Sequence, residues 1–207
     1  MTLFRRMCVA GAGLTAVLGG CRAHPKPVAQ HEAAKPKHTP VHVDSVVPRE
    51  VALARFQQAS ERTAAFEGGA PSRDVLVHAF VRAVETKDTT ALRRLVVSRG
   101  EFAYLVYPTS AQGLPPYNLS PDLYWFMTVE QSNRGVHHLI NELGGKHLSY
   151  AGYRCQGDST VEGENTLWGP CVIHTIQRRG DTLSQRLFGP IVARGGRYKF
   201  LSYSNRL

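Results

Sequence analysis

Residues 72–96, SRDVLVHAFVRAVETKDTTALRRLV, carry the clearest helical pattern in the chain and decide its fold class. Apolar side chains recur there at helical spacing and predict an amphipathic helix, with an inward face of Val75, Leu76, Ala79, Phe80, Ala83 and Val84. Ser72 is a typical N-cap, and Asp74 in the first turn complements the helix dipole. Asp88 or Thr89 caps a second, shorter helix that carries Leu92 and Leu95.

Further helices flank this pair. Residues 49–67 suit a loosely patterned helix, whose inward side chains are predicted to be Val51, Ala54, Phe56 and Ala59. Residues 101–107, EFAYLVY, fit either a strand or a helical turn before Pro108. A helix is expected to begin at Ser120, with proline in its first position, and a separate one to cover residues 134–143 before a Gly-Gly pair.

The hydrophobic period changes after residue 146. Residues 147–155, 167–177, 182–193 and 197–204 look like strands, and Gly180 and Gly195 lie where tight hairpin turns would be. We therefore expect an α+β fold, in which N-terminal helices pack on a curved C-terminal antiparallel sheet of about four to six strands.

The N-terminus resembles the signal of a bacterial lipoprotein. Arg5 and Arg6 precede a small-residue apolar stretch of twelve residues, 7–18, which is too short to span a bilayer. The stretch ends in LGGC at residues 18–21, similar to a lipobox. That resemblance implies removal of residues 1–20 and lipidation of Cys21. The alternatives are a plain secretory peptide or a buried N-terminal helix, which the glycines disfavour.

The rest of the chain divides into a tether and a domain. Residues 21–50 hold five of the twelve prolines and four histidines but no aromatic residue, a composition typical of a disordered linker. Residues 51–207 suffice for one hydrophobic core and form the single α+β domain. Because Arg22, and not aspartate, follows Cys21, we expect the outer membrane, facing the periplasm, if the cell has two membranes.

Two of the four cysteines remain in the domain. Cys155 and Cys171 form an even pair in an oxidising compartment, so a disulfide is predicted, with the polar segment 156–170 as a hairpin loop above it. The alternative is two free buried thiols. A zinc site is not expected, since neither cysteine belongs to a short C-x-x-C pair.

The order of elements resembles the nuclear transport factor two-like (cystatin-like α+β, SnoaL-like) superfamily over residues 72–206. The resemblance depends on the amphipathic helix, on Asp88 with the short helix that follows it, and on the closing strand YKFL at 198–201. It implies a sheet curled around helices to leave a conical pocket. Members range from isomerases and dehydratases to binding or dimerisation modules, so the fold does not supply the function.

Candidate pocket-lining residues are Tyr104, Tyr107, Trp125 and His174, with ordinary core packing as the alternative for each. No catalytic residue is assigned, since the chain lacks a nucleophile elbow, a P-loop and a dinucleotide fingerprint. We expect no cofactor and no metal.

The net charge of +9 is concentrated near the C-terminus, where residues 172–207 hold seven basic residues against Asp181 alone. A candidate basic patch comprises Arg178, Arg179, Arg186, Arg194, Arg197 and Lys199. Either it is a solvated sheet edge or it faces an anionic envelope component. Nucleic acid is not an expected partner in the envelope.

Together these features favour a lipid-anchored cell-envelope protein whose molecular role the sequence leaves open. The first hypothesis is a non-enzymatic module that binds a small apolar ligand or a partner, attached to the membrane by its lipid anchor. The alternative is a small-molecule isomerase, dehydratase or hydrolase that uses the cone pocket. A purely structural module, dimeric through its sheet, is the third hypothesis.

Overall fold

The computed structural model describes residues 47–206. The expected signal peptide, Cys21 and most of the tether lie outside the described residues. The helices are α1 (Arg49–Gln58), α2 (Arg73–Glu85), α3 (Thr89–Leu95), α4 (Arg99–Glu101) and α5 (Pro121–Glu142), with short helical turns η1 (Phe102–Val106), η2 (Tyr107–Thr109) and η3 (Ala111–Gly113) between the last two. None of the described helices has both the length and the apolar character needed to cross a membrane.

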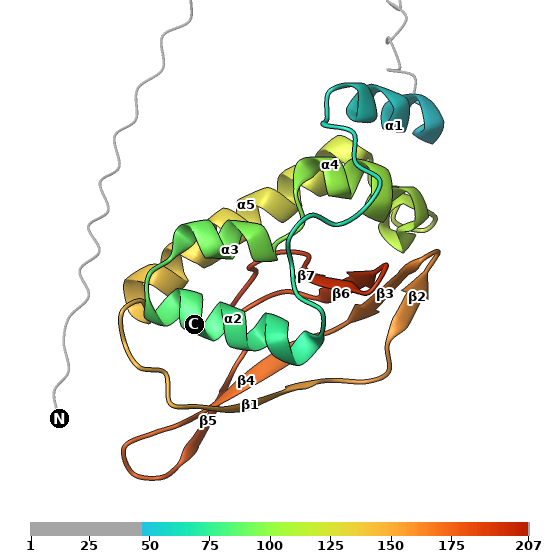
Figure 1. The fold of residues 1–207 in the computed structure, drawn as a ribbon. Helices are drawn as coiled ribbons and strands as arrows, with labels where there is room; N and C mark the ends of the chain where they lie inside the picture. The colour runs from blue at the N-terminus through green and yellow to red at the C-terminus, as the bar shows by residue number, and fades with distance from the viewer. Residues whose placement is uncertain (1–46, 207) are drawn as a thin grey trace, which may run out of the picture. The chain divides into compact units, whose positions relative to one another are not determined.

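Seven strands follow the helices and form two antiparallel sheets. They are β1 (Tyr150–Cys155), β2 (Thr160–Glu162), β3 (Asn165–Trp168), β4 (Cys171–Ile176), β5 (Thr182–Gln185), β6 (Ile191–Arg194) and β7 (Arg197–Phe200). One sheet has the order β1-β4-β5 and the other the order β2-β3-β6-β7. Figure 1 shows α2, α3 and α5 gathered on one side of the strands. The predicted α+β class, with helices before antiparallel strands, is confirmed. A simple meander is not formed, because β1 pairs with β4 and β3 pairs with β6.

Two clusters of buried side chains hold these layers together. The first surrounds α2, where Phe80 lies 5.3 Å from Phe188 and 5.5 Å from Phe200 between ring centroids. The second surrounds η1, where Phe102 contacts Phe56 from α1 and Trp125 from α5. The first cluster joins α2 to both sheets, and the second joins α1 and the N-terminal half of α5 to the central strands β3 and β6 of the larger sheet.

The predicted caps of the first helix pair are confirmed. The Ser72 hydroxyl accepts a hydrogen bond from the Val75 amide, and the Asp88 carboxylate accepts one of 2.8 Å from the Ala91 amide. One detail of the α2 face is wrong, because Val75 is exposed and Val77 is buried instead.

Two other helix predictions are wrong in detail. The first helix ends at Gln58, and of its predicted inward residues only Phe56 is buried. The two helices expected within residues 120–143 are one continuous helix, α5. The helix continues through Gly135. This glycine lies against the carbonyl oxygen of Tyr203, where a side chain would not fit. Residues 101–107, left open between strand and helix, are helical.

Two predicted strands are each divided between the sheets. Residues 167–177 contain the end of β3 and all of β4, interrupted at Gly169 and Pro170, and residues 182–193 contain β5 and most of β6. Proline cannot donate a ladder hydrogen bond, which explains the first interruption. The turns at Gly180 and Gly195 connect the antiparallel pairs β4–β5 and β6–β7 as expected.

The predicted disulfide between Cys155 and Cys171 is present. The two residues are direct register partners on β1 and β4. The segment between them is more than a polar loop, because it contains β2 and β3, which pair with each other and extend the larger sheet through β6. The disulfide therefore fixes the point at which the chain leaves the smaller sheet and returns to it.

Candidate functional site

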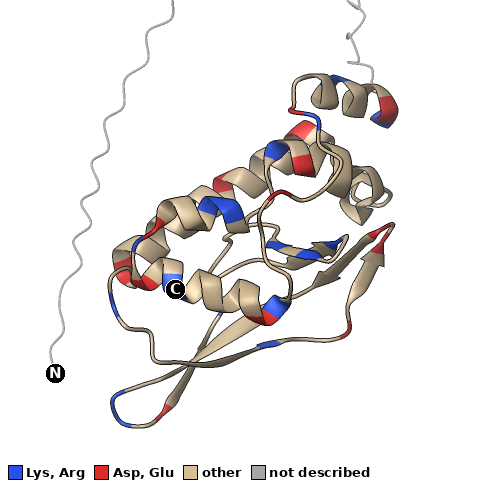
Figure 2. Cartoon of the chain, in the orientation of Figure 1, with Lys and Arg blue, Asp and Glu red and all other residues tan. Residues whose placement is uncertain are grey.

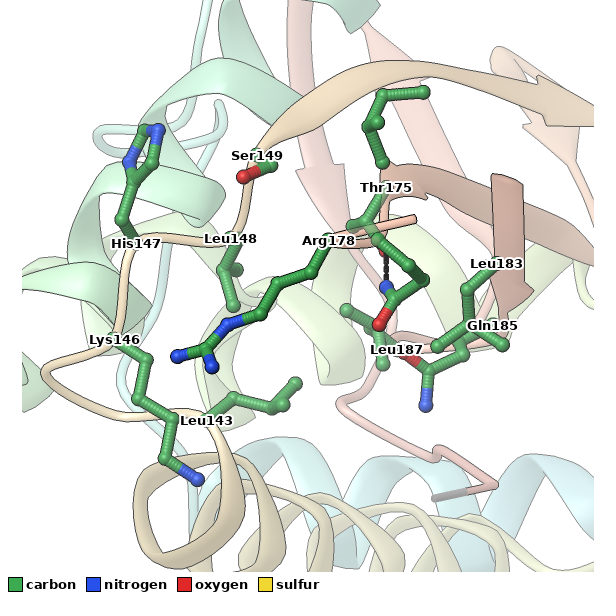
Figure 3. A pocket seen from close by; sticks show the side chains of 12 residues that line it. Leu143, Lys146, His147, Leu148, Ser149, Thr175, Arg178, Leu183, Gln185 and Leu187 are labelled. Atoms are coloured by element: carbon green, nitrogen blue, oxygen red, sulfur yellow. Dashed lines mark hydrogen bonds between the residues drawn. The ribbon is translucent and has the colours of Figure 1, made fainter. Parts of the chain in front are cut away.

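A cleft of about 570 Å³ opens between the β4–β5 hairpin and the segment that follows α5, and we call it the hairpin cleft. This volume lies within the range of small-molecule sites. Figure 3 shows its lining side chains, which come from residues 143–149 on one side and from the hairpin on the other.

The backbone of residues 143–149 is held in place by its neighbours. The Gly144 amide caps α5 by donating to the carbonyl of Leu139, and the Gly145 amide donates to the carbonyl of Val84 at the end of α2. Gly145 has a φ of +79°, which favours glycine at this helix end. The Leu148 amide then donates a 2.7 Å hydrogen bond to the Glu85 carboxylate. These bonds place Lys146, His147 and Leu148 beside the hairpin.

The hairpin wall is fixed by a tight turn. The Gln177 amide donates to the carbonyl of Asp181, and the Gly180 amide donates to the carbonyl of Gln177, both at 2.8 Å. Gly180 supplies the positive φ, +86°, that this turn requires. The Ile176 amide donates to the carbonyl of Ser149, which links the hairpin to the opposite wall. Arg178 therefore projects from a defined turn.

The inner surface of the cleft is apolar and consists of Leu143, Leu148, Leu183 and Leu187. Leu148 and Leu187 belong to the first core cluster, so this surface is continuous with the interior. Leu183 keeps 41% of its surface exposed. Part of the apolar surface of the cleft is therefore exposed to solvent, and a bound molecule could cover it.

The rim of the cleft is basic. Lys146, His147 and Arg178 line it, and no carboxylate is among the lining residues from the described part of the chain. The Lys146 ammonium donates to the carbonyl of Glu142, and His147 Nδ1 lies 3.1 Å from Glu85 Oε1. Arg178 has neither a hydrogen-bond nor an ion-pair partner among residues 47–206. In Figure 3 its guanidinium extends across the cleft toward the segment that carries Lys146 and Leu148.

The aromatic residues predicted to line a pocket lie elsewhere, in the second core cluster. Tyr104, Tyr107 and Trp125 gather around Phe102, with the Trp125 and Phe102 ring centroids 5.2 Å apart. The Tyr107 hydroxyl donates to the carbonyl of Leu119 and the Tyr104 hydroxyl to that of Gln57. Tyr107 borders a cavity of about 480 Å³ beside Arg49. These rings fill space in the core.

Burial also sets the chemistry of the tyrosines in this cluster. Desolvation raises the pKa of Tyr107 above its ordinary value, against an opposing effect of Arg49. Desolvation, reinforced by the charge of Glu162, raises the pKa of Tyr124. Burial therefore makes ionisation of either phenol less favourable, and the Tyr107 hydroxyl serves as a hydrogen-bond donor to Leu119.

His174, the fourth predicted lining residue, is separate from the aromatic group. It lies on β4 in the smaller sheet, and its Nδ1 is 2.8 Å from the hydroxyl of Ser184 on β5. Within residues 47–206 no set of three His, Cys, Asp or Glu side chains is arranged to hold a metal ion.

The six residues of the candidate basic patch are dispersed, and Figure 2 shows basic residues on both the β4–β5 turn and the β6–β7 pair. Lys199 is 2% exposed and paired with Glu101, so it lies in the interior. Arg194 pairs with Glu164 at 2.7 Å. Arg186 lies between β5 and β6, where its backbone pairs with that of Arg206, and Arg197 begins β7. Arg178 and Arg179 occupy the β4–β5 turn, and of the six only Arg178 lines the hairpin cleft.

Sequence reasoning missed Leu143, Lys146, Leu148 and Gln185, because they come from segments that become neighbours only in the folded chain. One available signal was the hairpin itself, where Ile176 and Leu183 flank a turn that carries Arg178.

No family model, no curated protein and no solved structure matches this chain.

Proposed function

We propose that this chain is a lipid-anchored cell-envelope protein whose domain is a non-enzymatic ligand-binding module. The observation that carries the proposal is the hairpin cleft, whose apolar inner surface is exposed and whose rim is polar and basic. Such an arrangement, an apolar cavity with a few polar groups at its edge, is typical of small-molecule sites.

Binding is favoured over catalysis by the state of the candidate catalytic groups. The aromatic residues that a cone-pocket enzyme would use are packed in the core, and Tyr107 is held as the neutral phenol. The Glu85 carboxylate, which lies beside the rim residue His147, is occupied by the Leu148 amide and by His147 itself. These contacts support a module that holds a ligand without transforming it.

The anchor and the family resemblance belong to the same proposal. The LGGC segment at 18–21 supports lipidation of Cys21, and the order of helices before strands supports a nuclear transport factor two-like domain. In a cell with two membranes the protein would occupy the outer membrane and face the periplasm. Replacement Cys21→Ser should abolish metabolic labelling with palmitate, and labelling that persists would refute the lipid anchor.

Ligand binding is tested by native mass spectrometry of the full chain purified without denaturant. We expect a bound small molecule that is lost from Leu183→Gln, because this exposed leucine forms part of the inner surface. Val161→Gln is the matched control, since Val161 is a 69% exposed aliphatic residue on β2 outside the cleft. Equal ligand occupancy in both variants, or no bound species in the unmodified protein, would contradict the proposal.

A further inference from the structure

We infer that the hairpin cleft selects a single-chain amphiphile with an anionic head group, a carboxylate or a phosphate ester. This inference rests on the proposed ligand-binding function and assigns the chemical class of its ligand. The head group lies at the rim between Lys146 and Arg178, and the hydrocarbon chain covers the leucines within.

The basic rim of the cleft is complementary in charge to an anionic head group. Three basic residues from two separate segments line the rim, and no carboxylate from residues 47–206 lines it with them. Glu85 lies behind His147 and is already hydrogen-bonded, while Glu142 borders an adjoining cavity with His138. An arginine fork without an acceptor is suited to bidentate contact with a carboxylate or phosphate, and a nearby lysine adds a second charge.

The apolar inner surface of the cleft is suited to a hydrocarbon chain. A purely polar anion would leave Leu183 in water, whereas a hydrocarbon chain removes its exposed surface from solvent. The apolar surface continues inward through Leu143 to the buried Leu148 and Leu187, so the chain and the head group have distinct places. Arg178 and Lys146 are anchored on opposite walls, and an anion between them links the hairpin to the segment after α5 (Figure 3).

The test uses the full chain and three probes of equal chain length, dodecanoate, dodecyl phosphate and dodecanol, each below its aggregation limit. Binding is measured by isothermal titration calorimetry. We expect at least one of the anionic probes to bind about tenfold or more tightly than the neutral alcohol, since hydrogen bonds to charged groups contribute that order of affinity. A preference for dodecanoate or for dodecyl phosphate identifies which anion the rim accepts.

Substitutions test the basic rim and the apolar inner surface of the cleft separately. Arg178→Gln and Lys146→Gln should each weaken binding of the anion about tenfold and leave dodecanol unchanged. Arg179→Gln is the matched control, because Arg179 is the next residue of the same turn but does not line the cleft. Leu183→Gln should weaken all three probes, and thermal unfolding of every variant checks that the fold is retained.

The outcomes separate this inference from the proposed function. If dodecanol binds as tightly as both anions and Arg178→Gln has no effect, the anionic head group is wrong while a ligand-binding cleft stands. If none of the probes binds although native mass spectrometry finds a ligand lost from Leu183→Gln, the ligand class is wrong and the function again stands. If neither method finds a ligand, both proposals fail.

Discussion

A buried ion pair links β7 to α4. Lys199 on β7 and Glu101 on α4 lie 2.8 Å apart, with side chains only 3% and 1% exposed. The Glu101 carboxylate also accepts hydrogen bonds from the amides of Glu67 and Ser98, and the Lys199 ammonium donates to the carbonyl of Glu67. The pair thus joins the larger sheet, the start of α4 and the segment before α2.

Removal of one partner should be strongly destabilising. Glu101→Gln and Lys199→Met each leave an unpaired buried charge, so we expect a loss of about 3–5 kcal/mol in the free energy of unfolding, measured by urea denaturation. Arg134→Ala is the control, because the Arg134–Glu130 pair is mostly exposed and should change stability by less than about 1 kcal/mol. Losses of similar size in all three variants would contradict this view of the buried pair.

Gly135 decides how closely α5 approaches the C-terminal segment. A Cβ there would overlap the carbonyl oxygen of Tyr203, while the Gly135 carbonyl accepts a hydrogen bond from the Asn205 side chain. Gly135→Ala should therefore lower stability by about 1–3 kcal/mol, despite the better helix propensity of alanine. Asn133→Ala, at an exposed position two residues away, should be neutral or slightly stabilising. A thermal unfolding midpoint in Gly135→Ala at or above that of the unmodified chain would refute the close approach.

Among the elements, those with strong local signals were predicted well. α2 and α3 each begin at a capping side chain, and their apolar spacing leaves little choice of conformation. The divisions between β3 and β4 and between β5 and β6 were not predicted, because both halves of each segment favour the extended state. Which sheet each half joins is determined by tertiary contacts with the neighbouring strand.

The disulfide stabilises the junction of the two sheets. Its sequence separation of 16 corresponds to about 3 kcal/mol in the loop-entropy model. The double variant Cys155→Ala, Cys171→Ala should lose stability of this order in urea denaturation, and Cys171→Ala alone should lose a similar amount. Under native, non-reducing conditions both cysteines should resist alkylation. Alkylation of both thiols, or full stability of the double variant, would exclude a structural role for the bond.

Across the whole domain, burial of tyrosines predicts sensitivity to alkali. The pKa of Tyr153 is raised to about 12, chiefly by desolvation and then by the hydrogen bond that its hydroxyl donates to Asp74. Burial also raises the pKa of Tyr150 and places that of Tyr203 well above its ordinary value. The unfolded chain loses these protons near pH 10 while the folded chain keeps them, so stability is complete below pH 10 and falls toward pH 12.

The decrease in the free energy of unfolding between pH 10 and 12 should be smaller in Tyr153→Phe than in the unmodified domain. Tyr117→Phe removes a hydroxyl from a 59% exposed side chain and serves as the control. Denaturant titrations across this pH range make the comparison, and identical pH profiles for the two variants would contradict the assignment to Tyr153.

The sequence by itself determined what depends on near neighbours along the chain. Helix caps, glycine turns, the change from helical to strand period and the even pair of cysteines are all local, and together they gave the α+β class and the disulfide. Tertiary structure alone decided the division into two sheets, the burial of Lys199 with Glu101 and the hairpin cleft. Each of these brings together residues that are tens of positions apart, as Lys146 and Arg178 are on the two walls of the cleft, and no short-range sequence pattern predicts such an arrangement.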